Sequence, residues 1–362
     1  MHIVHLLPEL HQGGVETIVL SLNRELIKRG HQSTVISNGG PLADQIKKDG
    51  GRHITLEVCS KNPLSVPFRV STLRSLLSDL RPSVVHAHSR VPAWLVWFAN
   101  KRLHLPWVTT VHGFNSVSKY SAIMTKGDRV ICVSNPVKEY IQQNYPVDKS
   151  KISVIHCGIA MEQFNPETVD HQQIESLKSE FNLHGKFVAT SIGRITELKD
   201  YETFIRAISM ACEANPNIRG LIVGHIREDK QDYYDRLQQL VVELRMQDHI
   251  HFATHCTSMP ELYALSDVVV SCSKKPESFG LTLIEALAMN TPVIATRHGG
   301  PLDIIREGEN GFLFEPQHPE ELAQKLCSEI HLQCTDLRAD TLERFGLDRM
   351  VDETLETYKK AL

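Results

Sequence analysis

The sequence has no long apolar run and lacks several short motifs of metal and cofactor sites. No stretch of about 18 consecutive apolar residues occurs, and the first residues, "MHIVHLLPELHQGG", form a short strand pattern broken by Pro8. We therefore expect neither a membrane span nor a signal peptide. The H-E-x-x-H motif of zinc hydrolases and the G-x-G-x-x-G fingerprint of dinucleotide-binding domains are also missing.

The cysteine spacing does not suggest a disulfide framework. They are scattered, several lie inside apolar strand-like runs, and none forms a C-x-x-C pair. This spacing predicts reduced, buried thiols in a cytoplasmic protein rather than disulfides or a zinc site. The eight residues are Cys59, Cys132, Cys157, Cys212, Cys256, Cys272, Cys327 and Cys334.

Negative charge is scarce in the first half of the chain and in excess in the second, while the two halves carry nearly equal numbers of positive residues. Residues 1–151 carry 19 Lys and Arg against 10 Asp and Glu, whereas the remaining residues carry 20 against 33. Ordinary solvated faces would explain such an imbalance, because a count does not place charges on one surface. We favour the alternative that the N-terminal half meets an anionic partner, such as a phosphorylated lipid or the cytoplasmic leaflet of a membrane.

Short apolar, β-branched runs recur along the chain with amphipathic segments between them. This pattern predicts parallel strands covered by helices on both faces, an α/β fold. The expected strands lie at "HIVHLL", "STVIS", "SVVHAH", "WVTTVH", "RVICVS", "ISVIH", "FVATSIG", "GLIVG", "HIHFA", "DVVVSCS" and "PVIAT". A polar stretch at 160–186 separates two sets of strands, so we predict two Rossmann-like domains, 1–165 and 166–345, and a final helical segment, 346–362. Ligands of such sheets bind at the carboxyl ends of the strands, which favours a cleft shared by the domains.

Two glutamates, Glu277 and Glu285, flank a small turn in "KKPESFGLTLIEALAMNTPVIA". Carboxylates usually lie on solvated surfaces, but these stand between an apolar strand and a helix that is otherwise almost all apolar. With the helix beginning near Leu281 or Thr282, the turn at 278–281 offers backbone N–H groups at the positive end of the helix dipole, and Gly280 permits close approach. The turn is a candidate anion site, and the carboxylates are candidate acceptors for the hydroxyls of a diol.

A second group of candidates follows other strand ends. Arg194 and Lys199 leave a strand in "GRITELKD", where two cations would clamp a diphosphate, although alone this stretch also fits an ordinary surface loop. His112 stands just past a strand in "VTTVHGF", where a single histidine is more often structural. Gly13 and Gly14 occupy the first strand-to-helix turn, which suggests backbone packed closely against a ligand.

Two further stretches combine cations with apolar residues. In "HAHSRVPAWLVWFANKR", Arg90 is a candidate ligand contact, whereas a strand end leading into a buried helix accounts for Trp94 and Trp97. The stretch at 60–82, "SKNPLSVPFRVSTLRSLLSDLRP", has an apolar face whose commoner use is to cover a sheet. Contact with a membrane surface is compatible with that use.

Taken together, these motifs resemble the retaining GT-B glycosyltransferases of family 4. The likeness rests on "PESFGLTLIEALAMNTPVIAT" followed by "GGPLDIIREGENGFLF", with "GRITELKD" upstream and the linker "HCGIAMEQFNP" before it, and it covers nearly the whole chain. It implies a GT-B fold, in which two Rossmann-like domains face each other across a cleft. The C-terminal domain would bind a nucleotide-sugar and the N-terminal domain an acceptor, and a helix from Asp348 could cross back to the N-terminal domain.

The resemblance also implies residue roles. In the catalytic set, Glu277 would contact the transferred sugar and His112 would reach it from the N-terminal domain, while Arg194 and Lys199 would clamp the diphosphate. Glu285 would hold the ribose hydroxyls. We expect further donor contacts at Gly14, Gly193, Ser278, Phe279, Gly280, Leu281 and Thr282, and acceptor contacts at Gly13, Arg90 and Phe114.

The expected reaction transfers a sugar from a nucleoside diphosphate to a hydroxyl, and the sugar keeps its anomeric configuration. UDP is the nucleoside diphosphate that we expect. No D-x-D motif of metal-dependent transferases occurs, so we expect no metal and no cofactor. The loops "HIREDKQDYY" and "FATHCTSMPELY" lack glycines that the family often has near the nucleotide base. The identity of the base therefore stays open.

The expected partners are a nucleotide-sugar donor and a glycan or glycolipid acceptor, such as lipopolysaccharide or another surface polysaccharide, and no nucleic acid. We expect a cytoplasmic protein, peripheral at the inner face of the cytoplasmic membrane if the basic half binds anionic lipid. Three alternatives stay open. A nicotinamide oxidoreductase would need the missing glycine fingerprint, a GT-B nucleotide-sugar epimerase would consume donor without acceptor, and a non-catalytic sugar-nucleotide-binding partner subunit would not need the intact charged set.

Overall fold

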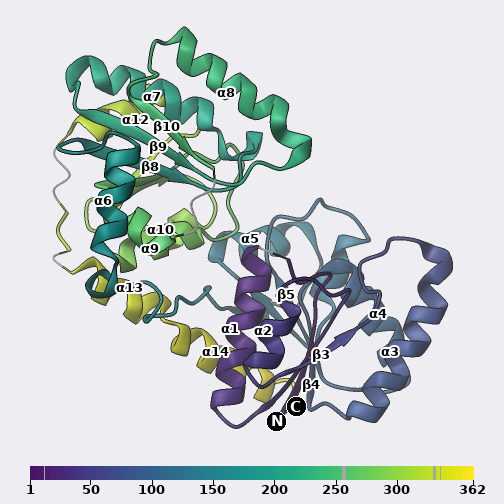
Figure 1. The fold of residues 1–362 in the computed structure, drawn as a ribbon. Coiled ribbons are helices and arrows are strands. Elements are labelled where there is room, and N and C mark those ends of the chain that lie inside the picture. The colour runs from purple at the N-terminus through teal and green to yellow at the C-terminus, as the bar shows by residue number, and fades with distance from the viewer. Residues whose placement is uncertain (12, 255–257, 329–331, 335) are drawn as a thin grey trace. The chain divides into compact units, whose positions relative to one another are not determined.

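The computed structural model describes the whole chain except residues 12, 255–257, 329–331 and 335. It divides into two compact units, one made of Met1–Gly158 with Leu347–Leu362 and the other of Ile159–Gly346. Each unit is a parallel sheet with helices packed on its faces (Figure 1). The division falls after Gly158 rather than at residue 165, and the segment from Leu347 onward is part of the first unit.

The first unit contains a seven-stranded parallel sheet in the order β3-β2-β1-β4-β5-β6-β7. Its strands are β1 (His2–Leu6), β2 (Gln32–Ser37), β3 (Arg52–Thr55), β4 (Val84–Ala87), β5 (Trp107–Val111), β6 (Arg129–Cys132) and β7 (Ile152–Val154). Its helices are α1 (Gly14–Lys28), α2 (Ala43–Lys48), α3 (Val66–Leu80), α4 (Arg90–Asn100), α5 (Asn135–Asn144) and α14 (Leu347–Lys359). The strand order reverses between β1 and β4, which is where sheets of this kind bind ligands.

Helix α1 shows how the sequence pattern produces this fold. Ile18, Val19, Leu22 and Leu26 recur at helical spacing and are buried. Burying each of these side chains contributes roughly 1.5–3 kcal/mol. The helix ends before Gly30, whose φ of 78° is a backbone conformation that glycine adopts easily. The predicted amphipathic helix is confirmed.

The last helix, α14, lies beside α1 in the first unit (Figure 1). Its buried face includes Met350, Val351 and Tyr358. Arg29, directly after α1, donates a hydrogen bond of 2.6 Å to the carboxylate of Asp348. Through the fully buried Tyr358, whose hydroxyl lies 2.6 Å from Nδ1 of His86 in β4, α14 contacts the sheet.

The second unit contains a six-stranded parallel sheet in the order β10-β9-β8-β11-β12-β13. Its strands are β8 (Phe187–Ile192), β9 (Ile218–Val223), β10 (Ile250–Ala253), β11 (Val268–Ser271), β12 (Val293–Thr296) and β13 (Gly311–Phe314). Its helices are α6 (His171–Glu180), α7 (Tyr201–Ala214), α8 (Gln231–Glu243), α9 (Met259–Ala264), α10 (Leu281–Ala288), α11 (Pro301–Ile304), α12 (Pro319–Cys327) and α13 (Leu337–Phe345). Here the order reverses between β8 and β11, so the loops after these strands form the second crevice.

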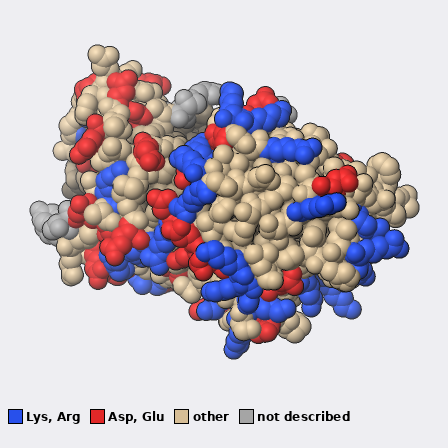
Figure 2. Space-filling model, turned by 90° about the horizontal axis from the view of Figure 1, so that it is seen from below, with Lys and Arg blue, Asp and Glu red and all other residues tan. Residues whose placement is uncertain are grey.

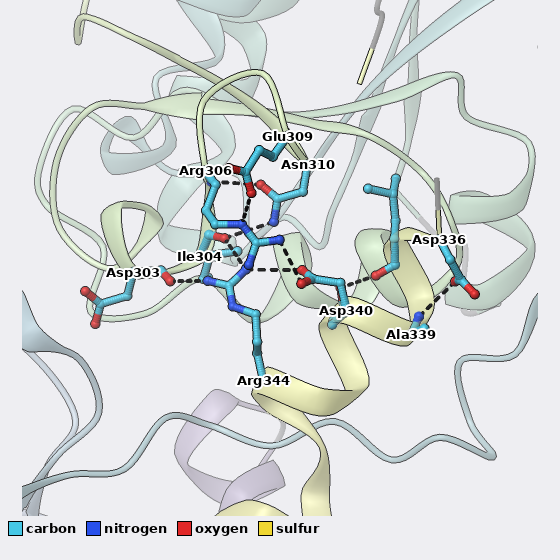
Figure 3. Close-up of polar contacts among 11 residues, drawn as sticks. Asp303, Ile304, Arg306, Glu309, Asn310, Asp336, Ala339, Asp340 and Arg344 are labelled. Carbon is cyan, nitrogen blue, oxygen red and sulfur yellow. Dashed lines mark hydrogen bonds and ion pairs between the residues drawn. The ribbon is translucent and has the colours of Figure 1, made fainter. Parts of the chain in front are cut away.

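Helix α13 is held to the end of α11 by a polar network (Figure 3). Arg306 donates a hydrogen bond of 2.7 Å to Asp340. Arg344 donates to the backbone carbonyls of Asp303 and Ile304 at 2.7 and 3.0 Å. These charge-assisted bonds satisfy carbonyls at the end of a short helix and fix α13 within the second unit.

Parts of the predicted organisation need correction. The edge strands β3 and β13 were not expected, because each is short and lacks a distinctive apolar alternation. Cys132, Cys157 and Cys272 are buried as predicted, but Cys327 is exposed, and the cysteines of the described ranges are free thiols. Cys256 lies outside the described residues. Among the described residues, no helix has the length and apolar character needed to cross a membrane.

Candidate functional site

In the second unit, Lys199 and Glu277 form an ion pair across the loops that follow β8 and β11. The ammonium group of Lys199 donates a hydrogen bond to Glu277 Oε1, and Ser273 donates a second one, of 2.7 Å, to the same oxygen. The Lys199 side chain is 28% exposed and that of Glu277 is 13% exposed. A loop cation and a loop carboxylate that are far apart in sequence thus meet at a crevice.

The ionisation of Glu277 is set by competition between burial and these partners. Burial alone would raise the pKa of Glu277, but the charge of Lys199 and the hydrogen bonds from Lys199 and Ser273 together hold it below its ordinary value. Glu277 is therefore a carboxylate at neutral pH. It can accept a hydrogen bond from a hydroxyl or stabilise positive charge on a sugar ring.

The loop that carries Glu277 is fixed by the segment after β12. The backbone N–H of Gly300 donates to the Glu277 carbonyl at 2.7 Å. At Gly299, φ is +66°, and an added Cβ would lie 2.3 Å from the Glu277 carbonyl oxygen, so only glycine fits there. His298 Nε2 donates to the carbonyl of Ser273 at 2.8 Å. These backbone contacts fix the position of the loop that carries Glu277.

Glu285 lies in α10, which begins at Leu281 as the sequence predicted. Tyr263 donates a hydrogen bond of 2.5 Å to its carboxylate. Burial raises the pKa of Glu285, and the bond from Tyr263 offsets only part of that shift. Gly280 is the N-cap residue of α10, with φ of 123°, and no side chain caps the helix there.

The remaining predicted donor residues of the second unit lie in the loop after β8, in the turn before α10 and in the first two residues of α10. Gly193 has φ of +156°, its carbonyl accepts a hydrogen bond of 2.6 Å from Tyr201, and an added Cβ would lie 2.8 Å from Lys199 Cε. Arg194 is exposed, and it makes no ion pair with any described residue. Ser278, Leu281 and Thr282 are partly buried, and Phe279 is buried.

In the first unit, three of the predicted N-terminal candidates lie around one pocket of about 350 Å³ at the ends of β1, β4 and β5. Arg90, His112 and Phe114 all line it. Arg90 donates to Ser121 Oγ at 3.2 Å, and its guanidinium lies 5.4 Å from the centre of the Tyr120 ring. The pocket is thus open to a polar ligand, with a cation and an imidazole in its wall.

Gly13 and Gly14, at the start of α1, are not among the residues that line this pocket. Gly13 is extended, a conformation that any residue adopts. An added Cβ there would lie 2.4 Å from a carboxylate oxygen of Glu16, so the glycine makes room for a side chain of the first turn. Gly14 is the first residue of α1.

The sequence did not reveal the side chains that hydrogen bond to the candidate residues in either unit. Tyr201, Tyr263 and His298 gave no signal, because single aromatic residues in apolar helices and loops usually serve the core. His88, which lies 3.1 Å from His112, could have been found. It stands two residues after His86 in "HAH", and alternate residues of a strand share one face of a sheet.

The comparisons with known proteins match both units. Residues 173–344 match the family model of glycosyl transferases group 1, and residues 12–163 match that of glycosyltransferase family 4. The chain belongs to the glycosyltransferases. Among curated relatives, this glycosyltransferase is 25% identical over 370 residues to spore coat protein SA of Bacillus subtilis, covering 96% of this chain and 95% of that protein.

Solved structures agree with the fold of this family member. It is similar to a glycosyltransferase from Rickettsia africae, with a TM-score of 0.90, 29% identity and coverage of 99% of this chain and 98% of that one. Anabaena HepE, solved with UDP and glucose, shares the fold at a TM-score of 0.86 and 20% identity over 99% of both chains. The predicted GT-B class, with two Rossmann-like domains, is confirmed.

Proposed function

We propose that this glycosyltransferase moves a hexosyl unit from UDP-sugar to a hydroxyl of a glycan or glycolipid, with retention of configuration. The observation that carries the proposal is the meeting of Lys199, Glu277 and Ser273 at the strand ends of the second unit. A cation and an ionised acid held by rigid loops suit a ligand with a diphosphate at one end and hydroxyls at the other.

On the donor side, each charged residue has a distinct role in the proposal. Arg194 and Lys199 neutralise the diphosphate as it leaves, since exposed Arg194 has no competing ion pair among the described residues. When the donor binds, Glu277, which accepts from Lys199 and Ser273, also accepts hydrogen bonds from the hydroxyls of the transferred sugar. Glu285 accepts from the ribose hydroxyls, and it accepts most strongly in its ionised form, which its raised pKa disfavours. The uridine assignment follows HepE, which was solved with UDP and glucose.

The chemical step breaks the bond between the anomeric carbon and the diphosphate oxygen. The acceptor oxygen forms the new bond on the same face, and its proton passes to the departing phosphate oxygen. The leaving charge is met by Arg194, Lys199 and the backbone of the turn at 278–281, so the proposal needs no metal ion. His112 contacts the transferred sugar in the same proposal.

The acceptor is proposed to be a phosphorylated, membrane-anchored glycan, such as lipopolysaccharide or another surface polysaccharide under synthesis. Arg90 in the pocket wall suits an anionic group. Lys and Arg side chains are spread over the right of the view in Figure 2, where α3 and α4 lie in Figure 1. Leu64, just before α3, and Phe68, in its first turn, are 88% and 75% exposed, as expected for side chains that enter a lipid surface. The protein would then act at the cytoplasmic face of the membrane.

The test is a transfer assay with a panel of UDP-, GDP- and ADP-sugars, glycolipid acceptors and EDTA. The proposal predicts product only with acceptor present, undiminished by EDTA, with the anomeric coupling constant of the donor retained. Inverted product would refute the retaining mechanism. Turnover of donor into an isomer without acceptor would identify an epimerase instead, and donor binding without any turnover would identify a partner subunit.

A further inference from the structure

A row of four histidines lies on one face of the first unit's sheet. His5 of β1 is paired in register with His86 of β4, and His88 and His112 follow β4 and β5 at the same edge. His5 Nδ1 lies 3.1 Å from His88 Nε2, and His88 Nδ1 lies 3.1 Å from His112 Nε2. These two contacts join three imidazoles into one hydrogen-bonded chain that ends in the pocket wall.

The rings of this chain are neutral at physiological pH. Burial lowers the pKa of His5 to about 3 and that of His112 to about 4. Burial and the neighbouring imidazoles lower the pKa of His88 well below its ordinary value. A neutral imidazole has one N–H and one lone pair, so each ring can donate at one nitrogen only.

The two possible directions of the chain differ at its buried end. If His88 donates to His112, then His5 donates to His88, and His5 Nε2 is left as a bare lone pair. If the direction is reversed, His5 Nε2 carries the proton. This atom is buried with no hydrogen-bond partner. Buried unpaired donors are rarer than buried unpaired acceptors, so the first direction is favoured.

We propose that His5 and His88 are positioning residues that fix His112 as the tautomer protonated at Nδ1. Nε2 of His112 accepts from His88, and Nδ1, which bonds no described residue, is left to donate. His112 therefore acts on a ligand as a neutral donor to an oxygen, such as a sugar hydroxyl or ring oxygen. It is neither a base nor a cation at that nitrogen.

A metal ion is the rival explanation, because one nitrogen each of His5, His86 and His88 lie within 4.8 Å of one another. However, both ring nitrogens of His86 are already engaged. Nδ1 lies 2.6 Å from Tyr358 Oη, and Nε2 lies 2.7 Å from Thr110 Oγ1. A metal would have to break one of these bonds, so the hydrogen-bonded chain is the better account.

The test uses protein labelled with ¹⁵N-histidine and carrying no histidine tag. Two-bond ¹H–¹⁵N correlation spectra at pH 7.5 report which ring nitrogen is protonated, and the His112→Gln variant assigns the signals. The expected result is protonated Nδ1 and bare Nε2 in His112. Protonated Nε2, or a cationic ring, would overturn the proposal.

Variants of His88 separate positioning from packing. The amide nitrogen of His88→Asn can take the place of Nδ1 and should preserve the His112 tautomer, whereas His88→Leu should release it to the Nε2–H form common in free histidine. Tyr358→Phe, which removes only the hydroxyl that bonds His86, is the matched control and should leave both the His112 tautomer and its response to His88 unchanged. An unchanged His112 tautomer in folded His88→Leu protein would contradict the assignment.

The catalytic consequence rests on the proposed function, but the spectra do not. In the transfer assay, His88→Leu should lower kcat by about tenfold with little change in KM, the order expected for one lost hydrogen bond, and His88→Asn should restore most of it. Correct spectra without transfer would defeat the proposed function alone. Shifts of the His5, His86 and His88 signals on adding one equivalent of Zn²⁺ would show a metal site and overturn the proposal.

Discussion

Lys199 donates a hydrogen bond to Glu277, 78 residues further along the chain. The pair joins the loop after β8 to the loop after β11, on the two strands where the second sheet reverses its order. Because parallel strands end at the same edge, this contact defines the site more sharply than either motif alone.

Replacing Lys199 by Met should remove most activity and some stability. The variant leaves a largely buried carboxylate without its cation, which should cost about 1–3 kcal/mol of unfolding free energy. Transfer should fall by about 100-fold or more because the leaving diphosphate loses a positive charge. Urea unfolding and initial rates measure the two effects. Lys275→Met, at an exposed position in the adjoining loop, is the control and should change neither.

Adding Glu277→Gln to this variant separates the two effects. The neutral amide no longer needs a cation, so the double variant should regain most of the lost stability while transfer stays absent. If Lys199→Met alone retained transfer within twofold of the wild type, the site assignment would be wrong.

The two glutamates should make the stability respond to pH in opposite ways. The pKa of Glu277 is lowered on folding, so its contribution is full above the unfolded value of about 4.3 and is lost as the pH falls through its folded pKa. The pKa of Glu285 is raised, so its contribution is full below that value and is lost as the pH rises through its folded pKa.

Thermal unfolding of Glu277→Gln and Glu285→Gln between about pH 3 and pH 8 tests these signs. In the lowest part of this range, the stability of the wild type relative to Glu277→Gln should increase as the pH rises. Above about pH 4, the stability of Glu285→Gln relative to the wild type should increase as the pH rises. Parallel curves for both variants would show that the environments of the acids differ from those described.

Gly299→Ala should destabilise the protein and impair the site together. The alanine Cβ would meet the Glu277 carbonyl, in a backbone conformation that L residues rarely adopt. Gly308→Ala, with φ of +77° but nothing near the added Cβ, isolates the conformational cost of about 1–2 kcal/mol. Gly299→Ala should lower the unfolding free energy by more than that cost, and it should also lower the donor affinity measured by calorimetry. Equal unfolding free energies for the two variants would rule out the close approach.

The membrane contact predicts salt-sensitive vesicle binding. The protein should float with vesicles of phosphatidylglycerol and phosphatidylethanolamine at low salt and less at high salt, because salt screens the attraction of the basic unit to anionic lipid. Leu64→Ser with Phe68→Ser should reduce flotation, whereas Leu302→Ser, at a 46% exposed position of the second unit, should not. Absence of flotation at both salt concentrations would remove the membrane part of the proposal.

The sequence predicted those elements whose pattern is local. The α/β class, helix α1 and the start of α10 followed from apolar periodicity and glycine positions. The edge strands β3 and β13 were missed because their burial depends on neighbours that the chain brings from elsewhere. Cys327 is different, because its mostly polar neighbours in "QKLCSE" are consistent with the exposure that the structure shows.

The sequence pointed to the charged residues of the candidate site but not to the residues that hold them in place. Glu277, Glu285 and Lys199 stand out because charged residues are rare beside apolar strands. Tyr263, Ser273 and His298 do not, since their roles arise from contacts made only in the folded unit. The histidine chain lies between these cases, because the spacing in "HAH" puts two rings on one face but gives no hint of His5.

The most direct test of the donor site is a crystal structure of the protein with UDP bound. The account predicts the diphosphate within hydrogen-bond distance of Arg194 and Lys199, and the ribose hydroxyls on the carboxylate of Glu285. UDP bound elsewhere, or bound in that crevice without contact to Lys199 and Glu285, would contradict it.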